Sequence, residues 1–391
     1  MPTKLEVYGE AIPRLKRGTA IVYRKWIRAS GSLGPGALVE LHSRGEPLGC
    51  GLWESQGPVA VRVLEHGKCT YNSHYDIIWH RLESSFRARE RLGVTAKGSY
   101  RLVNSDGDLL SGLIVDIYND VAVIQSSSTA MDSLINSISR AVMRLTGVKH
   151  VYEKSIQRSR RDIGLGLRAR WIVGRKEEVI IEEEGVKFLV DVVRGQKTGF
   201  FLDQRPNRIE VQRLTGSGDR VLDVFSYTGG FGIHAAISGA REVVFVEEDP
   251  VAVNILRRNL ELNGIKKFKI INDSIWKIRK AVASNYFDLV IVDPPAFIQD
   301  SSWSSVMKGI KAYRKAYIWA VERGKRPSIL FLSSCSYFLK RDMYIRILTD
   351  VLSPRTNNYK IMGSIRGSGP DHVFRGEEYL DYLKGSFIYV E

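Results

Sequence analysis

The chain has 391 residues, 44% of them hydrophobic and 26% charged. This composition is typical of a globular protein and excludes a disordered or fibrous chain, while the length predicts two or three domains. The net charge of +15 favours a polyanionic partner, because lysine and arginine neutralise phosphates; a basic surface that only keeps the protein in solution is the alternative. No apolar run approaches the roughly 18 residues of a membrane span, and the first residues lack the apolar stretch of a secretion signal. We therefore expect a cytoplasmic protein without a membrane partner.

The three cysteines, Cys50, Cys69 and Cys335, are an odd number at spacings that fit neither a disulfide framework nor a zinc site. We therefore expect no bound metal. A free cysteine is usually a small buried core residue, and we interpret Cys50 and Cys69 in this way. Cys335 differs from them because it follows a predicted strand.

Residues 1–72 read as short strands separated by glycine-containing turns, which predicts a small β-barrel domain. The expected strands are Thr19–Tyr23, Leu38–His42, Leu48–Trp53 and Val59–Val63. Between Lys4 and Arg28, seven basic residues are interleaved with aromatic ones, namely Tyr8, Tyr23 and Trp26. This mixture suits RNA, because cations bind phosphates and rings stack on bases. A solvated basic face over an aromatic core is the alternative.

Residues 73–178 mix helical and strand patterns, which predicts a central α/β domain. A helix is expected over His74–Leu92, and strand-rich sequence follows from Tyr100 to Asp120. The stretch from Lys154 to Lys176 is strongly basic, and the charge then reverses in EEVIIEEEG at 177–185. We take this change of composition as the domain boundary, near residue 178.

Residues 179–391 alternate apolar, strand-like runs with helical stretches, which predicts a largely parallel sheet covered on both faces. The runs are 220–225, 242–247, 267–273, 287–293, 328–334 and 385–391, and the clearest helices are Pro250–Asn263 and Ser304–Glu322. Ligands of such sheets bind beyond the carboxyl ends of the strands. The residues that follow each run are therefore the candidate site.

The ends of the first three runs fit a nucleoside cofactor. Asp223 precedes a glycine-rich turn that lacks the G-x-G-x-x-G spacing of dinucleotide-binding proteins. Its carboxylate would face a cationic amino-acid group better than a pyrophosphate. Glu247 could accept hydrogen bonds from both ribose hydroxyls, and Asn272 and Asp273 could contact an adenine edge. The pattern favours S-adenosylmethionine, although each residue alone could be a helix cap or a turn residue.

The next two runs end in DPPAF (293–297) and SSCSYF (333–338). Together with GQKTGFFLDQRPNR (195–208), LDVFSYTGGFG (222–232) and RNLELNG (258–264), they give the chain its resemblance to class I methyltransferases. Specifically, it resembles the 23S ribosomal RNA 5-methylcytosine methyltransferase family with an N-terminal PUA domain, over nearly the whole length.

This resemblance implies a Rossmann-like α/β catalytic domain with a mostly parallel seven-stranded sheet (179–391), a PUA-like β-barrel (1–72) and a central α/β domain (73–178). It also implies S-adenosylmethionine as cofactor and 23S-type ribosomal RNA as partner; a homodimer is the one protein assembly we consider. The cofactor-binding residues expected from the motifs and the resemblance are Asp223, Phe225, Ser226, Tyr227, Thr228, Gly229, Glu247, Glu248, Asn272, Asp273, Asp293, Lys197 and Arg205. For the loop that holds Lys197, a basic hairpin turn is the alternative.

The expected reaction explains why a cysteine and an aspartate follow neighbouring strands. Cytosine C5 is a poor nucleophile until a thiolate adds to C6, so Cys335 is the candidate nucleophile and Asp293 would hydrogen bond to N3 and the exocyclic amine. Pro294 and Pro295 would stiffen the substrate-binding loop. Phe297 would stack on the base or belong to the core. No second cysteine occurs in this motif, so the group that removes the C5 proton is not identified.

Two other functions fit parts of the pattern. Transfer to a nucleobase nitrogen also uses D/N-P-P-aromatic motifs and needs no thiol, so Cys335 would then be a structural residue. A noncatalytic RNA-binding protein that keeps the cofactor fold is the second alternative, against which the acidic strand ends and Cys335 argue.

Overall fold

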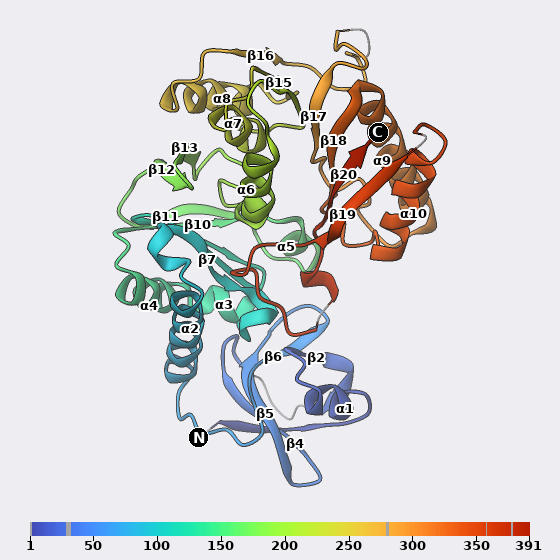
Figure 1. The fold of residues 1–391 in the computed structure, drawn as a ribbon. Helices are drawn as coiled ribbons and strands as arrows, with labels where there is room; N and C mark the ends of the chain where they lie inside the picture. The colour runs from blue at the N-terminus through green and yellow to red at the C-terminus, as the bar shows by residue number, and fades with distance from the viewer. Residues whose placement is uncertain (1, 29–32, 279–280, 357, 377) are drawn as a thin grey trace. The chain divides into compact units, whose positions relative to one another are not determined.

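The computed structural model describes residues 2–28, 33–278, 281–356, 358–376 and 378–391. The chain forms two compact units (Figure 1). The first contains Met1–Ile181, Val190–Leu202 and Pro370–Glu377, and the second contains Glu182–Leu189, Asp203–Gly369 and Glu378–Glu391.

The N-terminal part of the first unit is a six-stranded sheet in the order β2-β6-β5-β4-β1-β3. β1 runs parallel to β4 and the other neighbours are antiparallel. Apolar residues such as Leu41 and Val63, which are fully buried, form its core. Sequence reasoning missed β1 and started β2 two residues early. The elements are β1 (Thr3–Val7), α1 (Ala11–Lys16), β2 (Ile21–Tyr23), η1 (Arg24–Trp26), β3 (Ile27–Arg28), β4 (Leu38–Ser43), β5 (Glu46–Trp53) and β6 (Val59–His66).

The central part of the first unit is a five-stranded sheet in the order β11-β10-β9-β8-β7. Its apolar core includes Cys50, Leu52 and Leu64 from the N-terminal sheet, so the two sheets share buried side chains. Helix α2 starts where the hydroxyl of Ser73 accepts the backbone N–H of Asp76, a standard N-cap. The elements are α2 (His74–Arg91), η2 (Thr95–Lys97), β7 (Ser99–Asn104), η3 (Ser105–Asp108), β8 (Leu113–Tyr118), β9 (Val121–Ser126), α3 (Thr129–Ser133), α4 (Ile135–Thr146), β10 (His150–Ser155), α5 (Arg158–Asp162) and β11 (Arg168–Val173).

β12 (Glu178–Glu183) and β13 (Val186–Asp191) form a two-stranded sheet whose residues are divided between the two units. The segment Pro370–Glu377 returns to the first unit late in the sequence. There the carboxylate of Asp371 accepts the backbone N–H of Arg101 at 2.9 Å, and its carbonyl accepts a hydrogen bond from Arg89 at 2.7 Å.

The second unit contains a seven-stranded sheet in the order β16-β15-β14-β17-β18-β20-β19. The first five strands are parallel, and β20 runs antiparallel to both β18 and β19. All six predicted runs form strands, but the third ends earlier than predicted, at Ile271. The strands are β14 (Arg220–Val224), β15 (Glu242–Val246), β16 (Phe268–Ile271), β17 (Phe287–Val292), β18 (Gly324–Ser334), β19 (Tyr359–Arg366) and β20 (Lys384–Val390).

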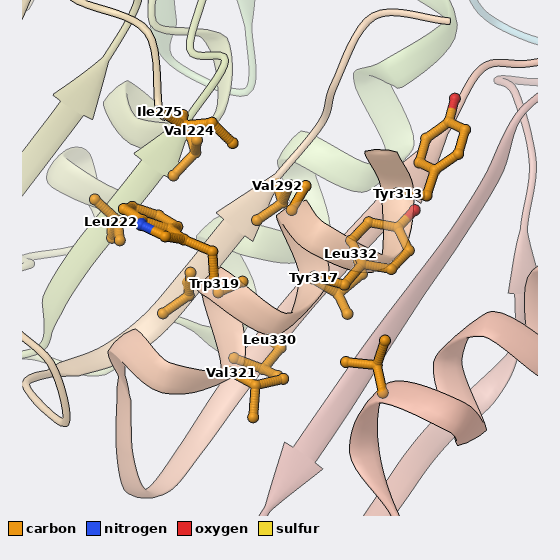
Figure 2. Packing of buried hydrophobic residues seen from close by; sticks show 14 of the residues in the cluster. Leu222, Val224, Ile275, Val292, Tyr313, Tyr317, Trp319, Val321, Leu330 and Leu332 are labelled. Carbon is orange, nitrogen blue, oxygen red and sulfur yellow. The ribbon is translucent and has the colours of Figure 1, made fainter. Parts of the chain in front are cut away.

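Helices cover both faces of this sheet (Figure 1). α7 packs on β14 and β15, and α9 packs on β17 and β18. Figure 2 shows Tyr313, Tyr317 and Trp319 of α9 among apolar side chains of the sheet. The hydroxyl of Tyr317 donates to the carbonyl of Ser333 at 2.7 Å, so it is buried without losing a hydrogen bond. The helices are η4 (Leu202–Gln204), α6 (Arg205–Leu214), α7 (Gly230–Ile237), α8 (Pro250–Leu262), α9 (Trp303–Arg323), α10 (Arg341–Leu352) and η5 (Glu378–Leu380).

Candidate active site at the carboxyl ends of the central strands

Asp223 lies near the end of β14, with only 1% of its surface exposed. Its Oδ2 accepts the backbone N–H of Gly232 at 2.8 Å, whereas the buried Oδ1 has no hydrogen-bond partner among the described residues. Burial raises the pKa of Asp223 to about 7, and the nearby charges of Asp293 and Glu247 add to the effect. An unpaired buried carboxylate oxygen is costly unless a ligand donor completes it. The amino-acid ammonium of S-adenosylmethionine fits this requirement.

The turn after β14 needs unusual backbone conformations. Phe225 (φ 61°), Tyr227 (φ 48°) and Gly229 (φ 88°) all lie in the left-handed region. A Cβ at Gly229 would lie 2.4 Å from Leu256, and one at Gly232 would lie 2.3 Å from the Phe245 ring. A side chain at either position would therefore collide with protein atoms.

Glu247 follows β15 and is oriented by two backbone groups. Its Oε2 accepts the N–H of Tyr227 at 2.7 Å and its Oε1 accepts the N–H of Asp249 at 2.9 Å. Burial raises the pKa of Glu247. Each carboxylate oxygen has a second lone pair, so the side chain fits the two ribose hydroxyls.

The residues after β16 have mostly local hydrogen bonds. The amide of Asn272 donates to the carbonyls of Glu247, at 2.9 Å, and Glu248, at 3.2 Å. Asp273 accepts the backbone N–H of Ser274 at 2.7 Å. Asn272 thus joins the loops that follow β15 and β16, a role that the sequence does not reveal. In the turn after β14, Ser226 donates to the Val246 carbonyl at 3.3 Å, and the Thr228 hydroxyl is buried without a partner among the described residues.

Asp293 follows β17 and is fixed by two donors. The side-chain amide of Gln204 donates to its Oδ1 at 2.8 Å, and the hydroxyl of Ser333 donates to the same oxygen. Pro294 is buried and Pro295 is exposed. The carboxylate therefore has one defined orientation at the edge of the sheet.

Cys335 follows β18, which is paired in parallel with β17 so that Val292 lies opposite Leu332. The thiol is half-buried, and its Sγ lies 3.8 Å from the carbonyl oxygen of Pro294. The loop that carries Asp293 and the thiol therefore lie at the same edge of the sheet as Asp223. Cys50, in contrast, is fully buried, and Cys69 is half-buried in the first unit.

Sequence reasoning gave no role to Lys384, at the start of β20. Only 1% of its surface is exposed, and its Nζ donates to the carbonyl of Ser336 at 2.8 Å. Burial lowers the pKa of Lys384 to about 8. Tyr313 completes this cluster: its hydroxyl lies 2.7 Å from the hydroxyl of Ser336 and accepts the backbone N–H of Phe297 at 3.3 Å.

Phe297 packs among other rings instead of standing free. Its ring centroid lies 4.8 Å from Tyr313, 6.1 Å from Phe225 and 6.3 Å from Trp276. Phe297 is half-buried against the core of the second unit, whereas Trp276 is 38% exposed. These contacts fit the alternative in which Phe297 belongs to the core.

A basic face lies on α9 beside these rings. The Nζ of Lys315 lies 4.5 Å from the centroid of the Trp276 ring. Lys308 and Lys311 occupy the same side of the helix at i, i+3 spacing, both exposed. No carboxylate within the described ranges lies within 4.0 Å of either ammonium group. We call Lys308, Lys311 and Lys315 the α9 basic face; helical spacing in the sequence could have revealed it.

Other predicted residues have structural contacts. Arg205 and Arg208 both pair with Glu183, at 3.0 and 2.7 Å, and all three are buried. Burial acts to raise the pKa of Glu183, but the guanidinium groups of Arg208 and Arg205 hold it well below its usual value. Lys197 belongs to the first unit, where its Nζ lies 4.5 Å from the centroid of the Phe201 ring.

The two basic stretches of the first unit are also partly structural. Arg160 is fully buried and pairs with Asp132 at 2.8 Å. Near the N-terminus, Arg14 and Lys25 lie over the ring of Trp26, at 5.2 and 4.9 Å from its centroid. These cations therefore contribute to folding as well as to the surface charge.

Comparisons with known proteins agree with this geometry. A family model described as S-adenosylmethionine-dependent methyltransferase matches residues 140–318, and one described as PUA-like domain matches residues 6–66. A Methanocaldococcus jannaschii protein, named as a candidate ribosomal RNA large subunit methyltransferase, is 34% identical over 100% of both chains. The ribosomal RNA large subunit methyltransferase I of Aeromonas salmonicida is 32% identical over 98% of both chains.

Two solved structures share the fold. A candidate methyltransferase complexed with SAH has a TM-score of 0.81, and a candidate SAM-dependent methyltransferase from Streptococcus mutans has a TM-score of 0.79. Each match covers 99% of this chain and 100% of the other at 22% identity. Among the described residues, no helix is long and apolar enough to cross a membrane.

The predicted combination of a PUA-like domain, a methyltransferase fold and S-adenosylmethionine as cofactor is thus confirmed. Two relatives above 30% identity match nearly the whole chain. The protein therefore belongs to the PUA-containing, S-adenosylmethionine-dependent methyltransferase family that includes the large-subunit ribosomal RNA methyltransferases.

Proposed function

We propose that this protein methylates C5 of a cytosine in large-subunit ribosomal RNA, with Cys335 as the covalent nucleophile. The observation that carries the proposal is the position of the thiol, half-buried and 3.8 Å from the Pro294 carbonyl, in the loop next to Asp293. The names of the relatives from two organisms support ribosomal RNA as the substrate class. A cytoplasmic location follows from this substrate.

The cofactor would be bound by the acidic strand ends. Oδ1 of Asp223 would accept the amino-acid ammonium, and Glu247 would accept the ribose hydroxyls. Asn272 and Asp273 would border the adenine. When bound, the cofactor supplies a methyl group activated by a sulfonium charge. Lys197 and Arg205 remain predicted cofactor contacts from the resemblance alone.

The chain's own groups would then act on the base. The Cys335 thiolate forms an S–C6 bond while the C5–C6 π electrons move to C5, which makes C5 nucleophilic. Asp293, oriented by Gln204, hydrogen bonds to N3 and the exocyclic amine and stabilises the charge that develops on the ring. After C5 has received the methyl group, the C5 proton leaves to solvent. The C5–H electrons restore the double bond and the S–C6 bond breaks, which returns the thiolate.

RNA would be bound mainly through phosphates. Lys315 of the α9 basic face lies 4.5 Å from the Trp276 ring, which in turn lies 6.3 Å from the ring of Phe297 in the loop that follows Asp293. Lysines bind the phosphates that flank a target base without reading sequence. The cation-covered rings near Trp26 in the PUA-like domain would add to this contact.

The proposal is tested by replacing Cys335 with Ala and measuring 5-methylcytosine in ribosomal RNA by mass spectrometry. We expect the variant to form no 5-methylcytosine and to bind S-adenosylmethionine with unchanged affinity by calorimetry, because the proposed cofactor contacts are made by Asp223 and Glu247 and not by the thiol. Cys69→Ala is the matched control, since Cys69 is also a half-buried free thiol.

Formation of 5-methylcytosine by Cys335→Ala would overturn the proposal. A product methylated on a ring nitrogen or an exocyclic amine would instead favour the alternative reaction, which needs no thiol. Loss of cofactor binding in the variant would show that Cys335 acts through the fold.

A further inference from the structure

Lys384 is a buried cation whose charge lacks an ordinary partner. Its Nζ donates to the carbonyl of Ser336 at 2.8 Å, and the side chain is 1% exposed. Within the residues that the structure describes, no carboxylate oxygen lies within 4.0 Å of this ammonium group. Taking an ammonium out of water without a counter-charge is expensive, so buried lysines are rare unless something compensates them.

The strand pairing places this charge beside the nucleophile. β20 runs antiparallel to β18, and Lys384 is the register partner of Ser334, directly before Cys335. The hydrogen bond from Nζ then reaches the residue directly after Cys335, at Ser336. The lysine thus spans the turn that carries the thiol.

The charges around Lys384 single out Cys335. Burial lowers the pKa of Lys384 to about 8, and the strongest opposing influence is the negative charge that Cys335 can carry. Asp381 acts in the same direction more weakly, and its carboxylate already pairs with Arg341 at 2.9 Å. Arg341 and Lys340 act in the opposite direction. With this pKa, most of the Lys384 side chains are protonated at neutral pH.

Two phenols of α9 also lie near the thiol. Tyr313 and Tyr317 of α9 both interact electrostatically with Cys335, and burial raises the pKa of both phenols, that of Tyr313 to about 12. Both are therefore neutral at physiological pH. Asp293, at the end of β17, is an acid. Lys384 is the cation that the described contacts place at the turn of Cys335, through Ser336 and the strand partner Ser334.

We propose that the Lys384 ammonium stabilises Cys335 as a thiolate, which makes Lys384 the positioning residue that activates the nucleophile. The proposal rests on the function proposed above, in which Cys335 attacks the base. When the S–H bond breaks, the sulfur keeps the electron pair and the proton leaves to solvent. A nearby cation is the usual way in which proteins increase the thiolate fraction of a reactive cysteine.

The test is the rate of Cys335 alkylation by iodoacetamide between pH 5.5 and 10, measured by mass spectrometry of the peptide that contains it. Lys384→Met removes the charge in an unbranched side chain of similar length. We expect the variant to react about tenfold more slowly at pH 7 and to titrate at least one pH unit higher. Both proteins should reach the same rate at the alkaline plateau, where the thiol is ionised without help.

Two further variants separate the charge from the hydrogen bond. Lys384→Gln can still donate to the Ser336 carbonyl but is neutral, so it should behave like Lys384→Met. Lys384→Arg retains the charge and should restore the reactivity at pH 7. If circular dichroism shows that Lys384→Met does not fold, the pH profile of Cys335 alkylation in Lys384→Gln is compared with that of the wild type instead.

Lys154 provides a matched control in the first unit. It is 2% exposed, its Nζ donates to the carbonyl of Val192 at 3.0 Å, and burial lowers its pKa to about 8. Its charge interacts with Asp191 and not with a cysteine. Lys154→Met should leave the alkylation profile of Cys335 unchanged, and Cys69 serves as the internal reference thiol in every sample.

The outcomes are distinct. An unchanged pH profile of Cys335 in folded Lys384→Met, or equal slowing at every pH, would overturn the proposal and leave the proposed function intact. A shifted profile supports it. If the profile shifts but Cys335→Ala still forms 5-methylcytosine, Lys384 activates the thiol and the proposed function is the part that fails.

Discussion

The side-chain amide of Gln204 donates a hydrogen bond to Oδ1 of Asp293 at 2.8 Å, and this contact fixes the carboxylate that borders the candidate active site. The amide is itself oriented, because Asn207 donates to its carbonyl oxygen at 2.6 Å. Gln204 is 2% exposed and lies directly before α6. Asn207 of α6 therefore orients Gln204, and Gln204 orients the carboxylate of Asp293.

Gln204→Ala should lower kcat at least tenfold, because a misplaced catalytic group loses much of its effect even when binding survives. The affinity for S-adenosylmethionine should change little. Steady-state methylation kinetics and calorimetry measure the two quantities. Gln212→Ala is the control, since Gln212 also lies on α6 and makes a side-chain hydrogen bond, to His234. Equal kcat values for the two variants would contradict the prediction.

The affinity for S-adenosylmethionine should fall as the pH is lowered below 7. Burial raises the pKa of Asp223 to about 7, so the acid is mostly protonated in the free enzyme at pH 6 and must ionise to pair with an ammonium group. We expect the affinity to weaken by up to tenfold for each pH unit below 7 and to level off above pH 8. The raised pKa of Glu247 acts in the same direction. Calorimetric titration at several pH values measures this dependence.

The same shift predicts the stability of the free enzyme. Because the folded-state pKa of Asp223 lies above its ordinary value of 3.8, its contribution is present at low pH and is lost as the pH rises from about 4 through about 7. Asp223→Asn should remove the contribution of this carboxyl group to the pH dependence of the cofactor affinity and to that of the free energy of unfolding. The variant should also bind the cofactor more weakly at pH 8. Binding that varies with pH as strongly in this variant as in the wild type would show that another group titrates.

Removing charge from the α9 basic face should weaken RNA binding. If Lys308 and Lys311 each contact a phosphate, Lys308→Gln/Lys311→Gln should reduce the slope of log affinity against log salt by about 1 to 2. Filter binding with a ribosomal RNA fragment at several salt concentrations measures it. Lys266→Gln/Lys267→Gln removes the same charge from exposed residues of the second unit, before β16. If the two double variants show the same slope of log affinity against log salt, the α9 lysines add only to the overall positive charge and do not contact particular phosphates.

Gly232→Ala should destabilise the second unit. Replacing a helical glycine by alanine normally stabilises a protein by about 0.5–1 kcal/mol. Here the new Cβ would lie 2.3 Å from the Phe245 ring and 3.0 Å from Oδ2 of Asp223. We expect a net loss of about 1–3 kcal/mol in the free energy of unfolding, together with weaker cofactor binding. Urea denaturation measures the first, with Gly166→Ala as the control because no atom lies within 4 Å of its added Cβ. A stabilised Gly232→Ala would disprove the packing argument.

The sequence by itself determined six of the seven strands in the large sheet of the second unit and the edge at which the candidate site lies. Strands buried on both faces are continuous apolar runs, and parallel strands present their carboxyl ends at one edge, so Asp223, Glu247, Asp293 and Cys335 could be grouped without coordinates. β19 was not predicted because it is an edge strand of mixed polarity, as the half-exposed side chains of Tyr359–Arg366 show. The division into domains at residues 72 and 178 stays a prediction.

Only the tertiary structure decided which cations are buried, which are paired and which lie at the candidate site. Arg160, in the basic stretch before residue 178, is buried in an ion pair with Asp132, and Arg205 is engaged with Glu183. Lys384, 48 residues beyond Ser336 in the chain, reaches the turn of Cys335 because β20 runs antiparallel to β18. A sequence pattern reports what each segment prefers over a few residues. Whether a charge is buried, paired or placed beside a thiol depends on which distant segments pack against it, and that is a property of the folded chain alone.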